Sequence, residues 1–438
     1  MIPLHFGIYL LTEQEMSVTH SGAGLAIPML IFCGLFLLAA ISAILLKKLR
    51  FPYTIGLVVI GMALGMAAEY SEILAPVLRL SLTHDLIMYV LLPVLVFEAA
   101  INIKFSALMK ELVPVLMLAI VGVILSTLVL GVILGELTPL TLAGALLFGA
   151  LISATDPVAV IALFKEVKAP ERMSLLMDAE SLFNDATAIV MFGIVLSIIQ
   201  SGTGVSGSTA FAAFVEFFRV FFGGIFVGAA MGAAMLVLLR LSRGMPYVHI
   251  ALTTILAFTS FIIADHVFET SGVMSVIAAG IVTRSYGRRA MADFMTLRHL
   301  DPYWEFMAFV ANSFIFLLLG LSEDFLLRNI ERLGMIYPTL IIAIVAVLMA
   351  RFLVVYLLLP VSNLMPLSNK VDSNSMKVMF WGGLRGVVPV ALMLSIPDSM
   401  PEKRMIIEMT LAVILFSLLI QGTTIGWLMS RLGIKREA

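Results

Sequence analysis

The sequence predicts an all-α integral membrane protein with about thirteen membrane-spanning helices. Of its 438 residues, 61% are hydrophobic and only 13% are charged, whereas a soluble domain carries about 25% charged residues. The apolar residues form repeated runs of roughly 16–28 residues, the length that a tilted helix needs to cross the hydrocarbon core. A transmembrane β-barrel would instead show short segments of alternating hydrophobicity.

Thirteen apolar segments are expected to span the membrane. In chain order they are residues 24–46, 53–68, 86–103, 113–134, 140–164, 174–199, 211–239, 248–264, 272–283, 304–321, 335–360, 376–396 and 405–430. The second and ninth segments are short for a span. The only low-complexity linker, SGTGVSGSTA at residues 201–210, precedes the seventh span.

Basic residues alternate strongly between successive loops. Every second loop from Lys47 onward contributes to a set of nineteen, namely Lys47, Lys48, Arg50, Lys104, Lys110, Lys165, Lys168, Arg172, Arg240, Arg243, Arg284, Arg288, Arg289, Arg298, Lys370, Lys377, Arg431, Lys435 and Arg436. The other loops carry only five, namely Arg79, Arg328, Arg332, Lys403 and Arg404. Because loops rich in Lys and Arg stay in the cytoplasm, we expect an extracellular N-terminus and a cytoplasmic C-terminus.

Two of the spans are predicted to be interrupted. The fifth contains ISATDPVAV, in which Pro157 leaves the carbonyl of Ser153 without its helical donor and pushes Asp156 out of the α region. The twelfth contains WGGLRGVVPV, in which three glycines weaken the helix and Pro389 frees the carbonyl of Arg385. Because the spans are seven apart, the two helices run in opposite directions. Such paired interruptions indicate an inverted-repeat transporter with its site at the bilayer midplane.

The interruptions also predict how the chain is divided. Gly and Pro are common in membrane helices, so either interruption alone would be weak evidence for an inverted repeat. The evidence is stronger because there are two interruptions and each one carries a charged residue. The expected parts are an extracellular segment (1–23), a first inverted repeat (24–200), a linker with a connecting span (201–239), a second inverted repeat (240–430) and a short cytoplasmic tail (431–438).

Charged residues inside the apolar runs have a negative surplus. The acids are Glu98, Asp156, Glu180 and Asp185, and the bases are Arg351 and Arg385. One ionised group at the bilayer centre costs roughly 3 kcal/mol or more, so such residues mark functional sites by default. The surplus predicts a site that attracts a cation.

The sixth span arranges its polar residues on two neighbouring helix faces. Ser181 and Asp185 share one face, with Asp178 one turn nearer the cytoplasm, and Glu180 and Asn184 share the next. Carboxylates, a hydroxyl and helix-break carbonyls suit a hard cation rather than a soft transition metal. Burial disfavours the ionised form of a carboxyl group, so such a group can also bind a proton near neutral pH. A site that holds either ion and opens to each side in turn is an exchanger.

Interhelical pairing is the alternative explanation for these charges. Pairing explains the presence of Glu180 and Arg351 at least as well as a role in ion binding does. It does not explain Asp185, because no base is left to pair with this residue. An organic-anion symporter would need a cationic or amide-rich cavity, and an intramembrane aspartyl protease that uses Asp156 and Asp185 would need two acids sharing a proton. The acidic surplus argues against the first, and the lack of a Gly-x-Gly-Asp motif against the second.

Other functional classes are disfavoured by residue content. The single cysteine, Cys33, excludes an internal disulfide and a multi-cysteine metal site. The six histidines lie near helix ends or in loops, and the sequence has no HExxH motif, which disfavours a zinc peptidase. We therefore expect a transporter in the lipid bilayer rather than an enzyme, with no cofactor and no nucleic-acid partner.

Four segments, FEAAINI, SATDPVAV, ESLFNDATAIV and GGLRGVVPVAL, resemble the signature segments of the monovalent cation:proton antiporter family, specifically its NhaP-type sodium/proton antiporters. They occur in the family's order, and the resemblance covers nearly the whole membrane portion. It implies an NhaA-like fold and Na⁺/H⁺ exchange, with a role in pH homeostasis, at the cell membrane of a prokaryote. It also implies a homodimer in which a six-helix ion-binding core moves against an interface domain. Li⁺ transport and K⁺/H⁺ exchange stay open, because selectivity depends on cavity size and ligand number.

The resemblance also implies roles for individual residues. Asp185 corresponds to the essential carboxylate that exchanges Na⁺ for H⁺. Asp156, Ser181 and the backbone carbonyl of Thr155 resemble the remaining Na⁺ ligands, and Glu98 lies close by.

The supporting residues are implied in the same way. Asn184 marks the branch that resembles electroneutral, one-for-one exchangers. Glu180 resembles the acid that pairs with an arginine of the eleventh span, Arg351, and holds Asn184 in place, and the second buried base, Arg385, is expected to support the same site.

Two positions depart from the family pattern. Asp178-Ala179 stands where Glu-Gly is common, so no ion-site role is assigned to Asp178. Val94 replaces a Pro that is common in the third span, and we expect this to affect helix shape more than ion binding.

Overall fold

The computed structural model describes residues 23–49, 51–71, 74, 77, 82–167, 169–202, 207–290, 294–322, 330–365 and 369–434. Several predicted features lie outside the described residues: almost all of the segment 1–23, residues 203–206 of the linker, residues 435–438 of the tail, and the basic residues Arg50, Arg79, Lys168, Arg328, Lys435 and Arg436.

The described residues form α-helices, extended in five places by short π-helical segments, and they contain no β-strand. The first half comprises α1 (Ala23–Leu49), α2 (Tyr53–Glu69), η2 (Leu86–Leu91), α3 (Leu92–Asn102), α4 (Phe105–Lys110), α5 (Leu112–Leu116), η3 (Met117–Val121), α6 (Gly122–Leu137), α7 (Leu142–Ile152), α8 (Val158–Val167) and α9 (Glu171–Ser201). The second half comprises α10 (Gly207–Leu241), α11 (Pro246–Ile262), η4 (Ile263–Val267), α12 (Gly272–Ala290), α13 (Phe294–Ser322), α15 (Ile330–Leu353), η5 (Val354–Leu358), α16 (Leu359–Asn363), α17 (Ser373–Trp381), α18 (Val387–Leu394), α19 (Lys403–Phe416), η6 (Ser417–Gln421) and α20 (Gly422–Arg431).

These helices confirm the predicted all-α membrane architecture. Each apolar segment expected to span the membrane falls on one helical rod or, for the fifth and twelfth, on two helices separated by an interruption. Within the described part of the chain, eight helices are long and apolar enough to cross a membrane, and four shorter apolar helices accompany them.

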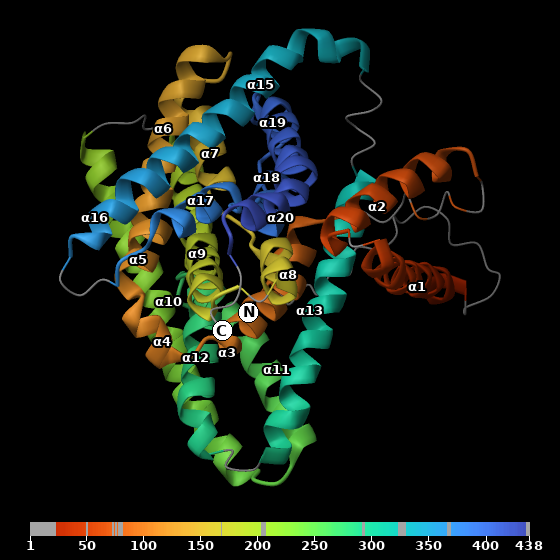
Figure 1. The fold of residues 1–438 in the computed structure, drawn as a ribbon, viewed down its shortest axis with the longest axis vertical. Helices are drawn as coiled ribbons and strands as arrows, with labels where there is room; N and C mark the ends of the chain where they lie inside the picture. The colour runs from red at the N-terminus through yellow and green to blue at the C-terminus, as the bar shows by residue number, and fades with distance from the viewer. Residues whose placement is uncertain are drawn as a thin grey trace, which may run out of the picture.

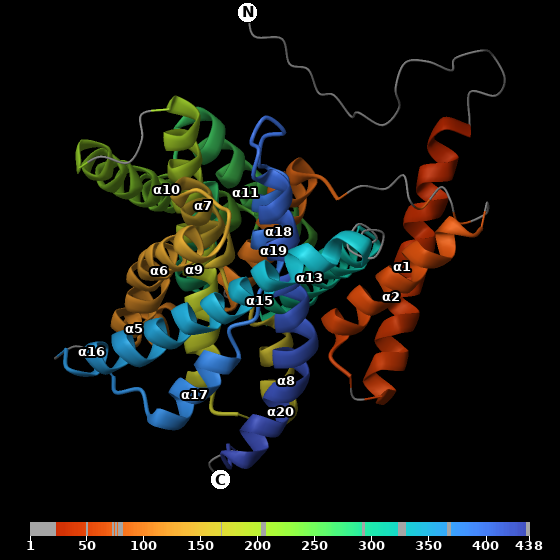
Figure 2. The ribbon, with the colours of Figure 1, turned by 90° about the horizontal axis from the view of Figure 1, so that it is seen from above.

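The helices are arranged around the two interrupted spans. In Figure 1, α6, α7, α15 and α19 form the upper part of the molecule, whereas α11, α12 and the first part of α13 form its lower end. In that view and in Figure 2, α1 and α2 lie at one edge, where both contact α13.

Small residues allow close packing of α10 against α12 over a long stretch. Gly224, Gly228 and Gly232 repeat every fourth residue along α10, and a Cβ atom at any of them would press on α12 or on Ser271, the residue before it. Close packing over such a stripe is a main source of helix association in lipid. The α10–α12 pair therefore forms a rigid wall beside α9 and α3, which both carry predicted site residues.

Candidate functional site

The two predicted interruptions are present, and they contact each other. Between α7 and α8 the chain leaves the helix over residues 153–157, and between α17 and α18 it does so over residues 382–386. The backbone N–H of Asp156 donates to the carbonyl of Leu384 over 2.8 Å. The guanidinium Nη1 of Arg385 donates to the carbonyl of Ala154 over 3.0 Å. The interruptions therefore cross, with each segment supplying a partner to the other.

Asp156 lies at the N-terminus of α8. Its Oδ1 atom accepts a hydrogen bond from the backbone N–H of Val158, at 2.9 Å, and the N-terminus of a helix favours a negative charge at this position. Gly386 passes so close to the carboxylate that a Cβ atom at this position would overlap it. Glycine is therefore the residue that permits the crossing.

Three hydrogen bonds join α9 to the first interruption through Thr155. The Ser181 hydroxyl donates to the Thr155 carbonyl over 2.6 Å. The Asn184 amide donates to Thr155 Oγ1 over 2.7 Å and accepts from the Thr155 backbone N–H over 3.3 Å. The residue that holds Asn184 in the structure is therefore Thr155, whereas the family resemblance implied Glu180.

Glu180 is bound instead by Arg351 of α15. Both guanidinium Nη atoms contact the carboxylate, one on each oxygen, and both residues are buried. Arg351 Nη2 also donates to the carbonyl of Met379 in α17 over 2.7 Å. The structure therefore contains the predicted pair of Glu180 with Arg351.

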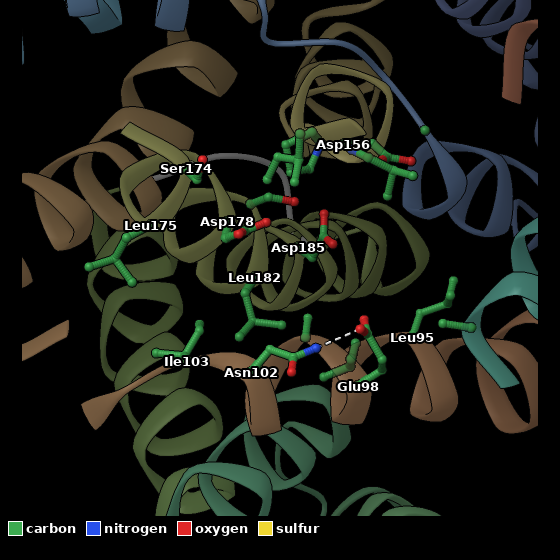
Figure 3. Close-up of a pocket in the computed structure, with 18 of the residues that line it drawn as sticks. Leu95, Glu98, Asn102, Ile103, Asp156, Ser174, Leu175, Asp178, Leu182 and Asp185 are labelled. Atoms are coloured by element: carbon green, nitrogen blue, oxygen red, sulfur yellow. Dashed lines mark hydrogen bonds between the residues drawn. The ribbon is translucent and has the colours of Figure 1, made fainter. Parts of the chain in front are cut away.

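Asp185 and Asp156 line one cavity of about 1140 Å³, together with Ser181 and Thr155. Figure 3 shows the carboxylates of Asp185 and Asp156 facing the same space, with Asp178 beside them. Glu98 lies across the cavity on α3, where the Asn102 amide donates to its Oε1 atom over 2.6 Å. The structure thus brings Asp156, Ser181 and Asp185 together and leaves Glu98 on the facing wall.

The cavity also reaches the loops. Its lining extends from Asp185 to Lys104, Lys110 and Arg172, which all belong to the basic set of loops. In the opposite direction along α9, the residues from Ile189 onward line a separate cavity of about 680 Å³. Between them, the helix residues 186–188 are completely buried.

Two residues of the last helical rod contact the site without having been predicted. Ser417 hydrogen-bonds to the backbone of the second interruption at Arg385, and Gln421 hydrogen-bonds to the carbonyl of Trp381 at the end of α17. Their spacing of four residues in the apolar run ILFSLLIQGTTI places both on one helix face, which is a pattern that could have indicated a buried polar contact.

Comparisons with known proteins indicate the family to which the chain belongs. Residues 35–431 match the family model described as "Sodium/hydrogen exchanger, transmembrane". The Na⁺/H⁺ antiporter ApNhaP of Aphanothece halophytica is 35% identical over 385 residues, which cover 88% of this chain and 70% of that protein. The Na⁺/H⁺ antiporter NhaH of Halobacillus dabanensis is 34% identical over 415 residues, which cover 92% of this chain and 98% of that protein.

A solved structure has the same fold. The sodium proton antiporter MjNhaP1 of Methanocaldococcus jannaschii, determined at pH 8, superimposes with a TM-score of 0.72 over 93% of this chain and 99% of its own, at 21% sequence identity. The family match over most of the chain, the relatives above 30% identity and this fold lead to one conclusion: the chain belongs to the sodium/hydrogen exchanger family.

Proposed function

We propose that the protein exchanges Na⁺ for H⁺ across the cell membrane, with Asp185 binding the two ions in turn. The observation that carries this proposal is the environment of Asp185, which lines the cavity beside a second carboxylate, Asp156, and whose side chain has no hydrogen bond or ion pair to any described residue. A carboxylate that lies inside a membrane protein without a base can be neutralised either by a proton or by a cation. Relatives named Na⁺/H⁺ antiporters support Na⁺ as that cation.

The remaining Na⁺ ligands are proposed to be Asp156, the Ser181 hydroxyl and the Thr155 carbonyl. Ser181 and Thr155 are hydrogen-bonded to each other, but each oxygen keeps a lone pair. A cation can therefore bind both oxygens without breaking the bond between them. An all-oxygen set with two carboxylates suits a hard monovalent cation, and Glu98 on the facing wall is proposed to add negative charge to the entry path.

Access to the site is proposed to alternate between the two cavities. The larger one is continuous from Asp185 to the basic loops, which the positive-inside rule places in the cytoplasm. Exchange then requires the buried segment 186–188 to become exposed to the second cavity.

We propose that α5–α9 and α15–α20 form the ion-binding core that makes this movement against the remaining helices, in a homodimer with extracellular N-termini. The crossed interruptions support an inverted repeat of residues 24–200 and 240–430.

Transport in liposomes tests the proposed function directly. The purified protein is reconstituted with an internal pH dye, and Na⁺, K⁺ and Li⁺ are added outside in turn. We expect Na⁺ to drive proton movement. A response to K⁺ alone would indicate a K⁺/H⁺ antiporter on the same scaffold, and no response to any of the three cations would contradict the proposal.

Exchange is expected to be electroneutral. Asn184 cannot titrate and is held by Thr155, Glu180 is bound by Arg351, and Asp156 is held at a helix N-terminus. One proton on Asp185 then exchanges for one cation. A transported elementary charge would couple to about 2.3 kcal/mol at 100 mV, so the Na⁺-driven rate should not change when a K⁺/valinomycin potential is imposed. A rate that follows the potential would mean that another acid titrates, with Asp156 the first to test.

A further inference from the structure

The second interruption breaks several helical hydrogen bonds, and for one of them both separated groups have new partners. In an unbroken helix the backbone N–H of Arg385 would donate to the carbonyl of Trp381, four residues earlier. Here the chain leaves the helix after Trp381, so this donor and this acceptor are separated. Within a membrane protein, unpaired backbone groups are costly because no bulk water can satisfy them.

Ser417 and Gln421 provide new hydrogen-bond partners for this donor and this acceptor. The Ser417 hydroxyl accepts from the Arg385 N–H over 3.1 Å, and the Gln421 side-chain amide donates to the Trp381 carbonyl over 3.2 Å. Both side chains are buried, with 1% and 4% of their surface exposed. One helical bond has thus been replaced by two bonds to a neighbouring helix.

Ser417 and Gln421 lie in a π-helical turn, which orients their side chains toward residues 381 and 385. η6 runs from Ser417 to Gln421 and ends with a hydrogen bond from the Gly422 N–H to the Ser417 carbonyl, five residues apart. The wider turn changes the direction in which its side chains project, and such turns often occur at functional sites. One turn further on, the Thr424 hydroxyl accepts from the indole N–H of Trp381 over 2.8 Å, which fixes the end of α17 to the same face.

The open segment positions Asp156. The non-helical segment presents the carbonyl of Leu384 to the Asp156 N–H, from which it accepts a hydrogen bond over 2.8 Å. The same segment brings Gly386 against the Asp156 carboxylate. A change at residues 417 or 421 is therefore transmitted through residues 381–386 to the backbone and carboxylate of Asp156.

We propose that Ser417 and Gln421 are positioning residues that keep the second interruption open and thereby set the cation affinity at Asp156. This inference rests on the proposed Na⁺/H⁺ exchange. Neither residue touches the ions. They act by preventing the N–H of Arg385 and the carbonyl of Trp381 from closing the helix.

The first test is the Na⁺ dependence of exchange by Ser417→Ala and Gln421→Met in liposomes. Each single variant should raise the KM for Na⁺ about tenfold, which corresponds to about 1.4 kcal/mol, with a smaller change in kcat. Ser417→Thr keeps the hydroxyl and should restore the wild-type KM. Thr423→Val is the matched control, because the exposed Thr423 hydroxyl bonds only to carbonyls of its own helix; its KM should stay at the wild-type value.

The double variant Ser417→Ala with Gln421→Met separates positioning from plain stability. Each single variant leaves one backbone group unpaired, but in the double variant these two groups can pair with each other and close the helix. We expect its melting temperature to lie no lower than that of the less stable single variant, while its KM is raised at least as far as theirs.

Two outcomes are decisive. Folded single variants with a KM within twofold of wild type would overturn the positioning role, and if Ser417→Ala does not fold, Gln421→Met decides the question in the same assay. A wild-type protein that shows no Na⁺-driven exchange would instead overturn the proposed function.

Discussion

Asp185→Asn is expected to abolish Na⁺-driven proton movement while the protein remains folded. The amide cannot take up a proton or neutralise a cation, so neither half of the exchange can proceed. Folding should survive because the Asp185 side chain has no hydrogen bond or ion pair to the described residues, and removing an unpaired charge from the interior of a membrane protein relieves a desolvation cost. Dye-detected exchange near the wild-type rate would contradict the assignment of Asp185.

Asp178→Asn provides the control for this substitution. Asp178 lies on the same helix and lines the same cavity, but no ion-binding role is proposed for it. We expect this variant to retain exchange.

A second measurement separates loss of binding from loss of movement. A ligand that binds only the folded state raises its stability by RT ln(1 + [L]/Kd), so Na⁺ should raise the melting temperature of the wild-type protein. Asp185→Asn should lose this stabilisation together with transport. If the stabilisation persists without transport, Asp185 acts in the movement rather than in the binding of the cation.

The interruptions were predictable because their causes are local. Pro157 lacks an N–H donor, and the glycines of the twelfth span lack side chains, so both act on their own stretch of backbone. The Glu180–Arg351 pair was predictable for another reason. With few charged residues inside the apolar runs, the possible partners of a buried base are limited.

The other polar contacts could not be predicted from one sequence. The family resemblance implied that Glu180 holds Asn184, and the polar faces of the sixth span do not reveal that Asn184 meets Thr155 of the fifth span. The spacing of Ser417 and Gln421 reveals a shared face but not the helix that it contacts. Those contacts depend on the crossing of helices that are distant in the sequence.

Arg351→Ala is expected to be the most destabilising single substitution at the site. It would leave Glu180 buried at 2% exposure without its base and deprive the Met379 carbonyl of its donor. Breaking a buried ion pair by removing one partner costs about 3–5 kcal/mol. As a control, Arg219→Ala removes the base of an exposed pair with Glu216, for which a loss of at most about 1 kcal/mol is expected.

The double variant Glu180→Gln with Arg351→Gln tests whether the loss comes from the pair itself. Two neutral amides leave no uncompensated charge, and they can still hydrogen-bond to each other between α9 and α15. Thermal melting should therefore show that the double variant is more stable than the sum of its single variants predicts, because residues in contact are energetically coupled. Simple additivity would show that Glu180 and Arg351 stabilise the protein independently. The stabilisation would then come from Arg351 holding α17 through the Met379 carbonyl rather than from the ion pair.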